Sequence, residues 1–451
     1  MLRAGVALAR AMRAVSRRLG RGGGTTAPGR VLLRLEPRAI ERLGARLEGG
    51  SALVSATNGK TTTASMIAAI LERAGVPVVG NRAGSNMHWG VATALLDGGR
   101  RKGELGLFEV DEAWLPSVAR SLDPKLILLA NLFRDQLDRY GELDLVADRW
   151  AEVVAGGEGS PRLVLNADDP LVADLGRERE GVVYFGLEDD SQALPELQHA
   201  ADSKHCRNCG AAYVYEAVYL GHLGRYRCPR CGRERPRPHV AAERVEPLGM
   251  AGSRLSLRTP AGPLELRLPL PGLYNAYNAV AATAAALELG ATLDHVRAGL
   301  EGFAAAFGRF EAIALGPREM WILLVKNPTG ANEVLRTLTL EDGQLDVWIA
   351  LNDGIADGRD VSWVWDADFE VLAGRVRRAT CSGTRAEEMA LRLKYAGIDA
   401  PIAVERDLGR SLDSAAADGD GRPLYALPTY TALLELRDLL SDRGVAGRWS
   451  E

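Results

Sequence analysis

A short β-rich run leads directly into a glycine-lysine-threonine loop and then into a helical pattern. Residues 51–57 read SALVSAT, the loop ATNGKTTT occupies 56–63, and apolar residues recur at helical spacing from Met66 to Ala74. In this setting, backbone N–H groups at the start of the helix point toward bound phosphates, and the loop lysine reaches the outer ones. The pattern predicts a nucleotide site on an α/β fold, although Val54 stands where the strict Walker spacing has its first glycine.

Six residues of this loop are expected to bind ATP, and a threonine hydroxyl among them is expected to ligate Mg²⁺. They are Thr57, Asn58, Gly59, Lys60, Thr61 and Thr62, with Thr61 as the metal ligand. Lys60 is also expected to be catalytic, because its charge offsets negative charge that grows on the phosphates in the transition state.

Strand-like and helical segments alternate on both sides of the loop. Short β-rich runs at 106–110, 125–132, 162–167 and 182–186 are separated by helical stretches such as 143–154. This alternation is typical of a mostly parallel sheet with helices on both faces. The fold class that we predict is therefore α/β.

The chain of 451 residues is too long for one compact core, and it divides into three expected parts. The alternation breaks at 188–240, and a second, smaller α/β unit follows a boundary near residue 307. We expect residues 1–47 to form a basic helix and a glycine-rich loop that pack on the central domain. The central domain, which binds ATP, is expected at 48–307, with an insertion at about 200–237. A C-terminal α/β domain is expected at 308–451.

The N-terminus is basic and amphipathic. Arginines recur among apolar residues from Arg3 to Arg30, with no acidic residue before them. We expect a helix that packs on the following domain, with attraction to an anionic membrane surface as the alternative. No uncharged apolar run has membrane-spanning length, so we expect a cytoplasmic protein that is peripheral at the inner face of the membrane at most. The net charge of -4 gives no general attraction for nucleic acid.

Four of the five cysteines form two CxxC pairs. Cys206 and Cys209 are separated by eighteen residues from Cys228 and Cys231, which is the spacing of a zinc ribbon. Four thiolates at this spacing complete a tetrahedral site with no open position, so we expect a structural Zn²⁺. Basic residues flank the pairs, which leaves a zinc-ribbon nucleic-acid-binding protein as an alternative function.

The loop TNGKTTT resembles the loop of Mur ligases and folylpolyglutamate synthetases. The resemblance continues in order through FEVDEAWL (108–115), NLFRDQLDRYGELD (131–144), LNADDP (165–170), LPGLYNAYNAVAATAAALELG (270–290) and GRFE (308–311). It implies a Mur ligase-like ATP-binding domain in which Glu109 binds Mg²⁺. It also implies that Asn275 and Asn278 contact adenine and that Arg309 meets the nucleotide. Asp111 and Glu112 are expected to lie behind Glu109 or in solvent.

Two departures from the family concern a second metal. Gln136 stands where the family has a metal-binding histidine, and Arg149 and Trp150 occupy the region of a carbamoylated lysine. These differences count against a second metal site. They also count against an amino-acid-adding Mur or folylpolyglutamate-type ligase, which is the other alternative function.

A Mur ligase core that carries a zinc ribbon resembles the MurT group of that family. The C-terminal segments 324–335, 351–370, 381–397 and 425–436 also resemble this group. The resemblance implies ATP-dependent amidation of the α-carboxyl of D-glutamate in the lipid II stem peptide, at the inner membrane face. The product is D-isoglutamine, and the reaction passes through an acyl-phosphate. It also implies a heterodimer with a GatD-like glutamine amidotransferase subunit.

The nitrogen is expected to come from that partner or from free ammonia. Cys381 is the only cysteine outside the ribbon, and no motif marks a Cys-His glutaminase. The resemblance implies that a C-terminal aspartate completes the partner's Cys-His pair and orients its histidine. We choose Asp360 first and Asp357 second, with ordinary turn aspartates as the alternative.

Overall fold

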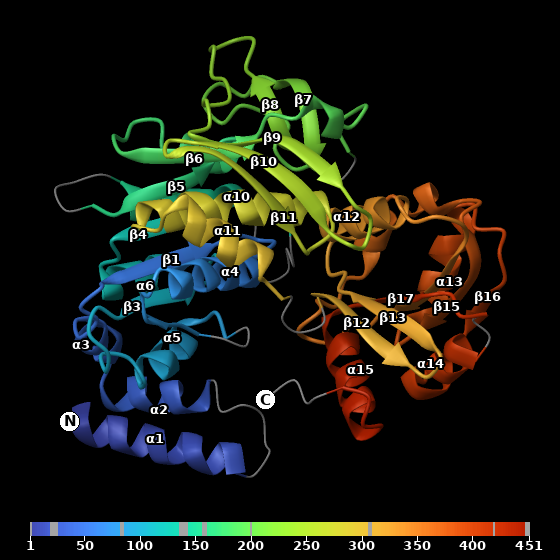
Figure 1. Cartoon of the computed structure of the whole chain (residues 1–451), viewed down its shortest axis with the longest axis horizontal. Helices are drawn as coiled ribbons and strands as arrows, with labels where there is room; N and C mark the ends of the chain where they lie inside the picture. Colours follow the sequence, from blue (N-terminus) through green and yellow to red (C-terminus); the bar gives the residue numbers. More distant parts are fainter. Residues whose placement is uncertain are drawn as a thin grey trace.

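The protein consists of two lobes, each built on its own β-sheet (Figure 1). The computed structural model describes residues 2–18, 26–81, 85–134, 143–155, 160–198, 201–304, 309–417 and 420–446. The chain passes from the first sheet to the second between residues 304 and 309.

The first sheet is mostly parallel. Its order is β11 (Gly262–Leu268), β10 (Ser253–Thr259), β9 (Val240–Pro247), β6 (Val182–Leu187), β5 (Arg162–Asn166), β4 (Leu126–Leu129), β1 (Ser51–Ser55), β3 (Leu105–Glu109) and β2 (Val78–Val79). All pairs from β2 to β9 are parallel, and β10 and β11 add an antiparallel edge. Every residue of β1 and β3 is buried, because helices cover both faces of the sheet.

The two faces of strand β1 divide the core of this lobe. Ala52 and Val54 contribute to a cluster with α4 (Lys60–Arg73), α10 (Leu273–Glu288) and α11 (Leu293–Glu301). Leu53 belongs to the opposite cluster, which holds α3 (Ala39–Gly44), α5 (His88–Leu95), α6 (Leu115–Leu122), α8 (Leu143–Val154) and α9 (Pro170–Asp174). Because α10 is rich in alanine, it packs closely on the sheet and is buried along most of its length.

The basic N-terminal segment forms helix α1 (Leu2–Arg18) beside α2 (Ala27–Leu35). Val6 and Ala9 are buried in the same cluster as Leu32 of α2. Arg13 pairs with Asp97 of the central lobe, which fixes one arginine of α1 against the fold. None of the helices described is long and apolar enough to cross a membrane.

The segment between β6 and β9 is an insertion. It contains a short 3-10 turn η1 (Asp190–Gln192) and the antiparallel hairpin β7 (Val214–Leu220) and β8 (Leu223–Arg227). The hairpin stands above the main sheet in Figure 1 and carries the cysteine pairs on its flanks.

The second sheet forms a smaller α/β lobe. Its order is β12 (Arg309–Leu315), β13 (Arg318–Leu323), β17 (Leu424–Pro428), β14 (Leu345–Ala350), β15 (Val376–Ser382) and β16 (Ile402–Val404). The helical elements around it are α12 (Pro328–Leu338), η2 (Ser362–Trp365), η3 (Phe369–Leu372), α13 (Ala386–Tyr395), α14 (Leu408–Ala417) and α15 (Tyr430–Asp442). Together the two lobes and the insertion confirm the predicted α/β fold class.

Candidate active site

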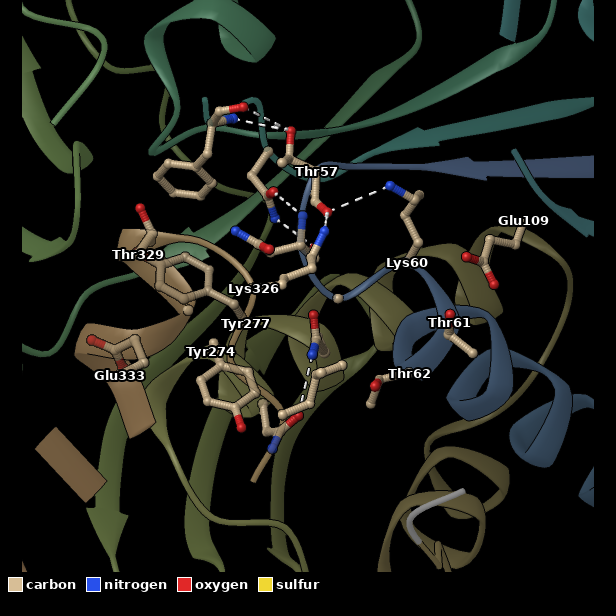
Figure 2. A pocket seen from close by; sticks show the side chains of 18 of the residues that line it. Thr57, Lys60, Thr61, Thr62, Glu109, Tyr274, Tyr277, Lys326, Thr329 and Glu333 are labelled. Atoms are coloured by element: carbon tan, nitrogen blue, oxygen red, sulfur yellow. Dashed lines mark hydrogen bonds between the residues drawn. The ribbon is translucent and has the colours of Figure 1, made fainter. Parts of the chain in front are cut away.

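A cavity of about 340 Å³ lies between the two lobes. Its walls come from the 56–63 loop, strand end β3, helix α10 and helix α12 (Figure 2). The sequence-predicted residues that line it are Thr57, Asn58, Gly59, Lys60, Thr61, Thr62, Glu109, Asn275 and Asn278. The fold thus gathers most of the expected nucleotide-binding residues in one place.

Gly59 allows the loop to touch helix α10. Its φ angle is 83°, and a Cβ atom there would lie 2.1 Å from Asn278 Oδ1. Position 59 therefore requires glycine, because its positive φ angle is strained for other residues and Asn278 occupies the place of a side chain. Thr63 Oγ1 also lies 3.2 Å from Asn278 Oδ1, and Asn278 Nδ2 donates to Asn275 Oδ1 at 3.2 Å. The two buried asparagines are thus ordered directly against the loop.

Asn131, which follows strand β4, holds the loop from its other side. Its Oδ1 accepts from the backbone N–H of Asn58 at 2.9 Å, and its Nδ2 donates to the carbonyl of Asn58 at 3.0 Å. Thr57 Oγ1 accepts from the N–H of Phe133 at 3.0 Å. Sequence reasoning did not identify Asn131. Its position just after a buried parallel strand could have indicated it, because ligands bind at the carboxyl ends of such strands.

Lys60 is buried and forms an ion pair with Glu112, with Nζ 2.8 Å from Oε2. Burial lowers the pKa of this lysine, but the carboxylates of Glu112, Asp111 and Glu109 outweigh burial and hold the pKa above its ordinary value. Lys60 is therefore a firmly charged group. Asp111 and Glu112 are both buried, so of the two expected placements the solvent-exposed one is excluded. Glu112 faces the loop lysine.

Glu109 ends strand β3, beside Val54 of strand β1, and its side chain is buried. Asn81 fixes its backbone, because Asn81 Oδ1 accepts from the Glu109 N–H at 2.9 Å and Asn81 Nδ2 donates to the Glu109 carbonyl at 2.7 Å. Figure 2 shows Glu109 and Thr61 at the same end of the pocket. A carboxylate and a hydroxyl are hard oxygen donors, so this pair fits Mg²⁺ chemically.

Arg149 and Trp150 occupy the region in which the resemblance places a carbamoylated lysine. Arg149 is exposed, whereas Trp150 is buried and its Nε1 donates to the carbonyl of Glu112 at 3.0 Å. Trp150 therefore supports the acidic turn behind Lys60 and offers no metal ligand. Gln136 lies outside the described residues.

The C-terminal lobe contributes two residues that sequence reasoning did not assign. Lys326 Nζ donates to the carbonyl of Thr57 at 3.3 Å, and Asn327 Nδ2 donates to Asn58 Oδ1 at 2.9 Å. Asn327 Oδ1 also caps helix α12 by accepting from the N–H of Gly330 at 2.8 Å. These contacts join the second lobe to the 56–63 loop. Arg309 begins strand β12, and its side chain lies outside the described part of the chain.

The two predicted aspartates differ in surroundings, and neither lines the cavity. Asp357 is buried and accepts from both the N–H and the hydroxyl of Thr431, and burial raises its pKa. Asp360 is exposed, and the hydrogen bond from Ser362 lowers its pKa. Asp357 is thus buried against Thr431, whereas Asp360 is exposed and accepts its hydrogen bond from the nearby Ser362.

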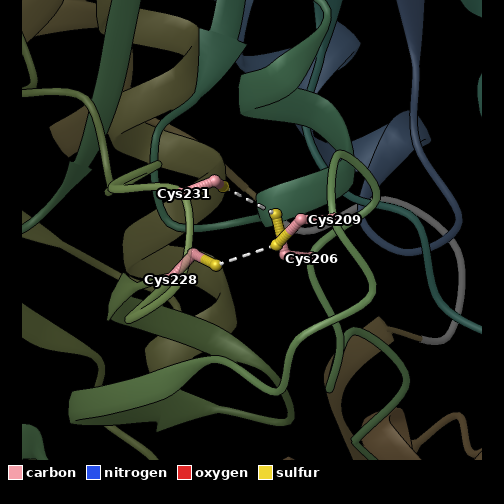
Figure 3. A group of neighbouring side chains, drawn as sticks. All are labelled: Cys206, Cys209, Cys228 and Cys231. Atoms are coloured by element: carbon pink, nitrogen blue, oxygen red, sulfur yellow. Dashed lines mark hydrogen bonds between the residues drawn. The ribbon is translucent and has the colours of Figure 1, made fainter.

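The four ribbon cysteines converge at the flanks of the hairpin (Figure 3). Their sulfur atoms all lie within 4.8 Å of one another, with 3.5 Å between Cys206 and Cys231 and 3.4 Å between Cys209 and Cys228. Zinc–sulfur bonds of about 2.3 Å in a tetrahedron place the sulfurs about 3.8 Å apart. All four thiols are free of disulfides. The cluster is therefore consistent with a zinc site.

The basic residues of the insertion are largely neutralised within the chain. Arginines on both sides of the hairpin form ion pairs with carboxylates of the insertion and the central lobe: Arg207 with Asp144 and Asp148, Arg225 with Asp190, Arg233 with Asp174, and Arg235 with Asp168. This pairing weakens the case for a nucleic-acid-binding face.

The insertion also forms part of the cavity wall, which the sequence did not indicate. Leu220 and Leu223, on either side of the hairpin turn, line the cavity. Arg336 of helix α12 donates to the carbonyls of Tyr219 and Gln192 at 3.1 and 3.0 Å. The insertion therefore contacts helix α12 of the C-terminal lobe as well as the central lobe.

Comparisons with known proteins agree with this arrangement. Residues 54–226 match the family described as "Mur ligase middle domain", and residues 324–433 match "MurT ligase C-terminal". "Lipid II isoglutaminyl synthase (glutamine-hydrolyzing) subunit MurT" of Staphylococcus aureus is 32% identical over 96% of this chain and 96% of its own length. The protein of the same name from Streptococcus pneumoniae is 32% identical over 98% and 97% of the two chains.

Solved structures share the fold. The pseudomurein peptide ligase type C from Methanothermus fervidus superposes with a TM-score of 0.70 and 23% identity, covering 89% of this chain and 80% of that chain. At this identity the similarity concerns the fold alone. It includes both lobes, because 89% of the chain cannot be covered by either lobe separately.

Proposed function

Because the chain belongs to the MurT family of Mur ligases, we propose that it is the ATP-dependent synthetase subunit of a lipid II isoglutaminyl synthase. It amidates the α-carboxyl of D-glutamate in the lipid II stem peptide to D-isoglutamine, at the inner face of the membrane. The observation that carries this proposal is the full-length similarity to MurT subunits, combined with a cavity in which both lobes meet the phosphate loop.

The first half-reaction activates the substrate carboxylate. ATP lies with its phosphates on the 56–63 loop, and a carboxylate oxygen of the substrate attacks the γ-phosphorus as ADP leaves. Lys60 offsets the negative charge that spreads over the transferring phosphoryl group. Bound Mg²⁺, held by Glu109 and Thr61, would further neutralise the β- and γ-phosphate oxygens.

The second half-reaction forms the amide. Ammonia attacks the carbonyl carbon of the acyl-phosphate, and the carbon–nitrogen bond forms. Inorganic phosphate leaves with the electrons of the carbon–oxygen bond, and the nitrogen gives up one proton to the phosphate. Lys326 of the C-terminal lobe lies beside the loop and adds positive charge near the departing phosphate.

The nitrogen comes from a partner glutaminase of the GatD type. Cys381 is buried, and burial raises the pKa of its thiol to about 12, so this thiol is a poor nucleophile. Asp360 is exposed and available to orient a partner's histidine, whereas Asp357 is engaged with Thr431. We therefore assign the supporting role to Asp360.

Zinc in the four-cysteine cluster has a structural role in this proposal. A site closed by four thiolates has no position for substrate, and the module that it stabilises carries Leu220 and Leu223 of the cavity wall. Trp150 lies in the region of the carbamoylated lysine and bonds to the carbonyl of Glu112. The absence of that lysine from this region argues against an amino-acid-adding ligase.

One experiment tests the proposal directly. The chain is purified with its glutaminase partner and incubated with lipid II, ATP and glutamine, and the products are analysed by mass spectrometry. We expect an amidated stem peptide that requires ATP and the partner. A product that carries an added amino acid, or no ATP-dependent product with either glutamine or ammonium, would show that the proposal is wrong.

A further inference from the structure

Glu333 is a buried carboxyl that the chemistry above does not use. It lies on helix α12, is 2% exposed and lines the cavity. Its Oε2 accepts no hydrogen bond from any residue in the described part of the chain. Arg336, one turn along the helix, donates instead to carbonyls of the insertion. Leaving a buried acceptor unpaired costs free energy, and a ligand that donates an N–H would remove that cost.

The position of Glu333 indicates which part of a ligand it meets. Figure 2 shows Glu333 and Thr329 at one end of the pocket and Thr61 and Glu109 at the other, with Tyr274 and Tyr277 between them. The Thr61 end is the phosphate end, because it contains the loop and the first turn of α4. A nucleotide that lies along the cavity therefore directs its base toward Glu333.

The walls near this end suit a flat, largely apolar ring. Tyr274 and Phe310 both line the cavity, and their ring centroids are 5.5 Å apart. Leu220 and Leu223 of the insertion add aliphatic surface. Such surroundings favour a purine base with one edge offered to a buried polar group.

We propose that Glu333 accepts a hydrogen bond from the exocyclic amine of adenine and thereby selects ATP over GTP. Guanine has a carbonyl oxygen at the corresponding position, so above about pH 7, where the pKa of Glu333 leaves it ionised, an acceptor would face its carboxylate. The inference rests on the proposed function, in which ATP is the energy source. It adds a C-terminal residue to the adenine contacts expected from Asn275 and Asn278.

The test compares nucleotides that differ only at this edge. ATP, GTP and purine riboside triphosphate, which lacks the exocyclic amine, are titrated calorimetrically into the wild-type chain and into Glu333→Leu. We expect Glu333→Leu to weaken ATP binding about tenfold or more, and to leave the amine-free nucleotide nearly unchanged. Asp342→Asn, which removes an exposed carboxyl just beyond the same helix, serves as the control.

A second variant tests selectivity. In Glu333→Gln the side-chain amide can donate to the guanine carbonyl, so the preference for ATP over GTP should narrow about tenfold. Thermal unfolding of each variant confirms that the chain remains folded.

Three results would overturn the inference. Equal losses for ATP and the amine-free nucleotide would mean that Glu333 only shapes the cavity. Unchanged ATP affinity, with a raised ammonium requirement for amidation, would assign the carboxyl to the nitrogen substrate. A wild-type chain that binds no nucleotide would overturn the proposed function itself, and the inference with it.

Discussion

Lys60 and Glu112 form a buried ion pair at the phosphate end of the cavity, with Nζ and Oε2 2.8 Å apart. Their side chains are only 10% and 11% exposed. In the proposed function, the phosphates of ATP would therefore share Lys60 with a carboxylate that the chain already supplies. The pair keeps the lysine charged and in place at the loop.

Lys60→Ala should lower ATP hydrolysis and amidation at least about 100-fold, because the charge that offsets the transferring phosphoryl group is lost. It should also destabilise the fold by about 3–5 kcal/mol, because Glu112 is left buried without its partner. The double variant Lys60→Ala/Glu112→Gln should recover most of the stability but no activity. Steady-state kinetics and chemical denaturation check both parts, and normal amidation by Lys60→Ala would contradict the loop assignment.

The four-cysteine cluster should hold one zinc ion per chain, which elemental analysis of freshly purified, reduced protein would measure. Cys228→Ser should lose most of this zinc and lower the thermal stability of the insertion, because metal binding contributes to its folding. Since Leu220 and Leu223 line the cavity, nucleotide affinity should fall as well. Cys381→Ala is the matched control and should retain its zinc. Zinc-free wild-type protein would contradict the assignment.

Glu333 should make stability depend on pH. Burial raises its pKa in the folded chain to about 7 from an ordinary value of 4.5, so the folded state holds this proton more tightly than the unfolded state. The resulting stability is present below pH 4.5 and is lost as the pH rises through about 7. Glu333→Gln should therefore stabilise the ligand-free chain by up to about 3 kcal/mol at pH 8, with little gain at pH 4. Denaturation at both pH values checks this, and an equal gain at both would exclude titration as the cause.

Local patterns were sufficient to predict the strand, loop and helix at 51–73 and the parallel sheet around them. The strand before residue 56, the helix after Gly59 and the buried parallel strands all leave short-range signals of composition and periodicity. The CxxC spacing similarly predicted the convergence of Cys206 and Cys228 from opposite sides of a hairpin.

The missed residues depend on contacts between distant segments. Nothing near Glu333 in the sequence indicates that its carboxyl faces a cavity formed with the central lobe, because that wall belongs to α10 and to the insertion. The hairpin residue Leu220 reads as an ordinary strand residue until α12 is placed beside it. Lys326 and Asn327 follow a strand, but their target is the loop more than 260 residues earlier. Tertiary packing supplies these relationships, and local sequence does not.

Asp360 acts in only one of the two half-reactions in the proposed function. Asp360→Asn should strongly reduce amidation driven by glutamine but spare much of the activity driven by added ammonium. A triad acid stabilises the imidazolium that forms when the partner's cysteine attacks glutamine, and acyl-phosphate formation does not need that imidazolium. The exposed position of Asp360 allows a partner's histidine to reach it.

Asp357→Asn is the informative comparison, because the carboxylate of Asp357 is already bound by Thr431 at the start of helix α15. We expect this variant to lose thermal stability and to reduce both activities together. Both variants are assayed with both nitrogen sources in the presence of the partner, and complex formation is confirmed by gel filtration. Selective loss in Asp357→Asn alone would move the triad role three residues along the loop. Parallel loss of both activities in Asp360→Asn would instead place that residue in substrate binding, since ammonium can replace the partner's product but cannot replace a contact to the substrate.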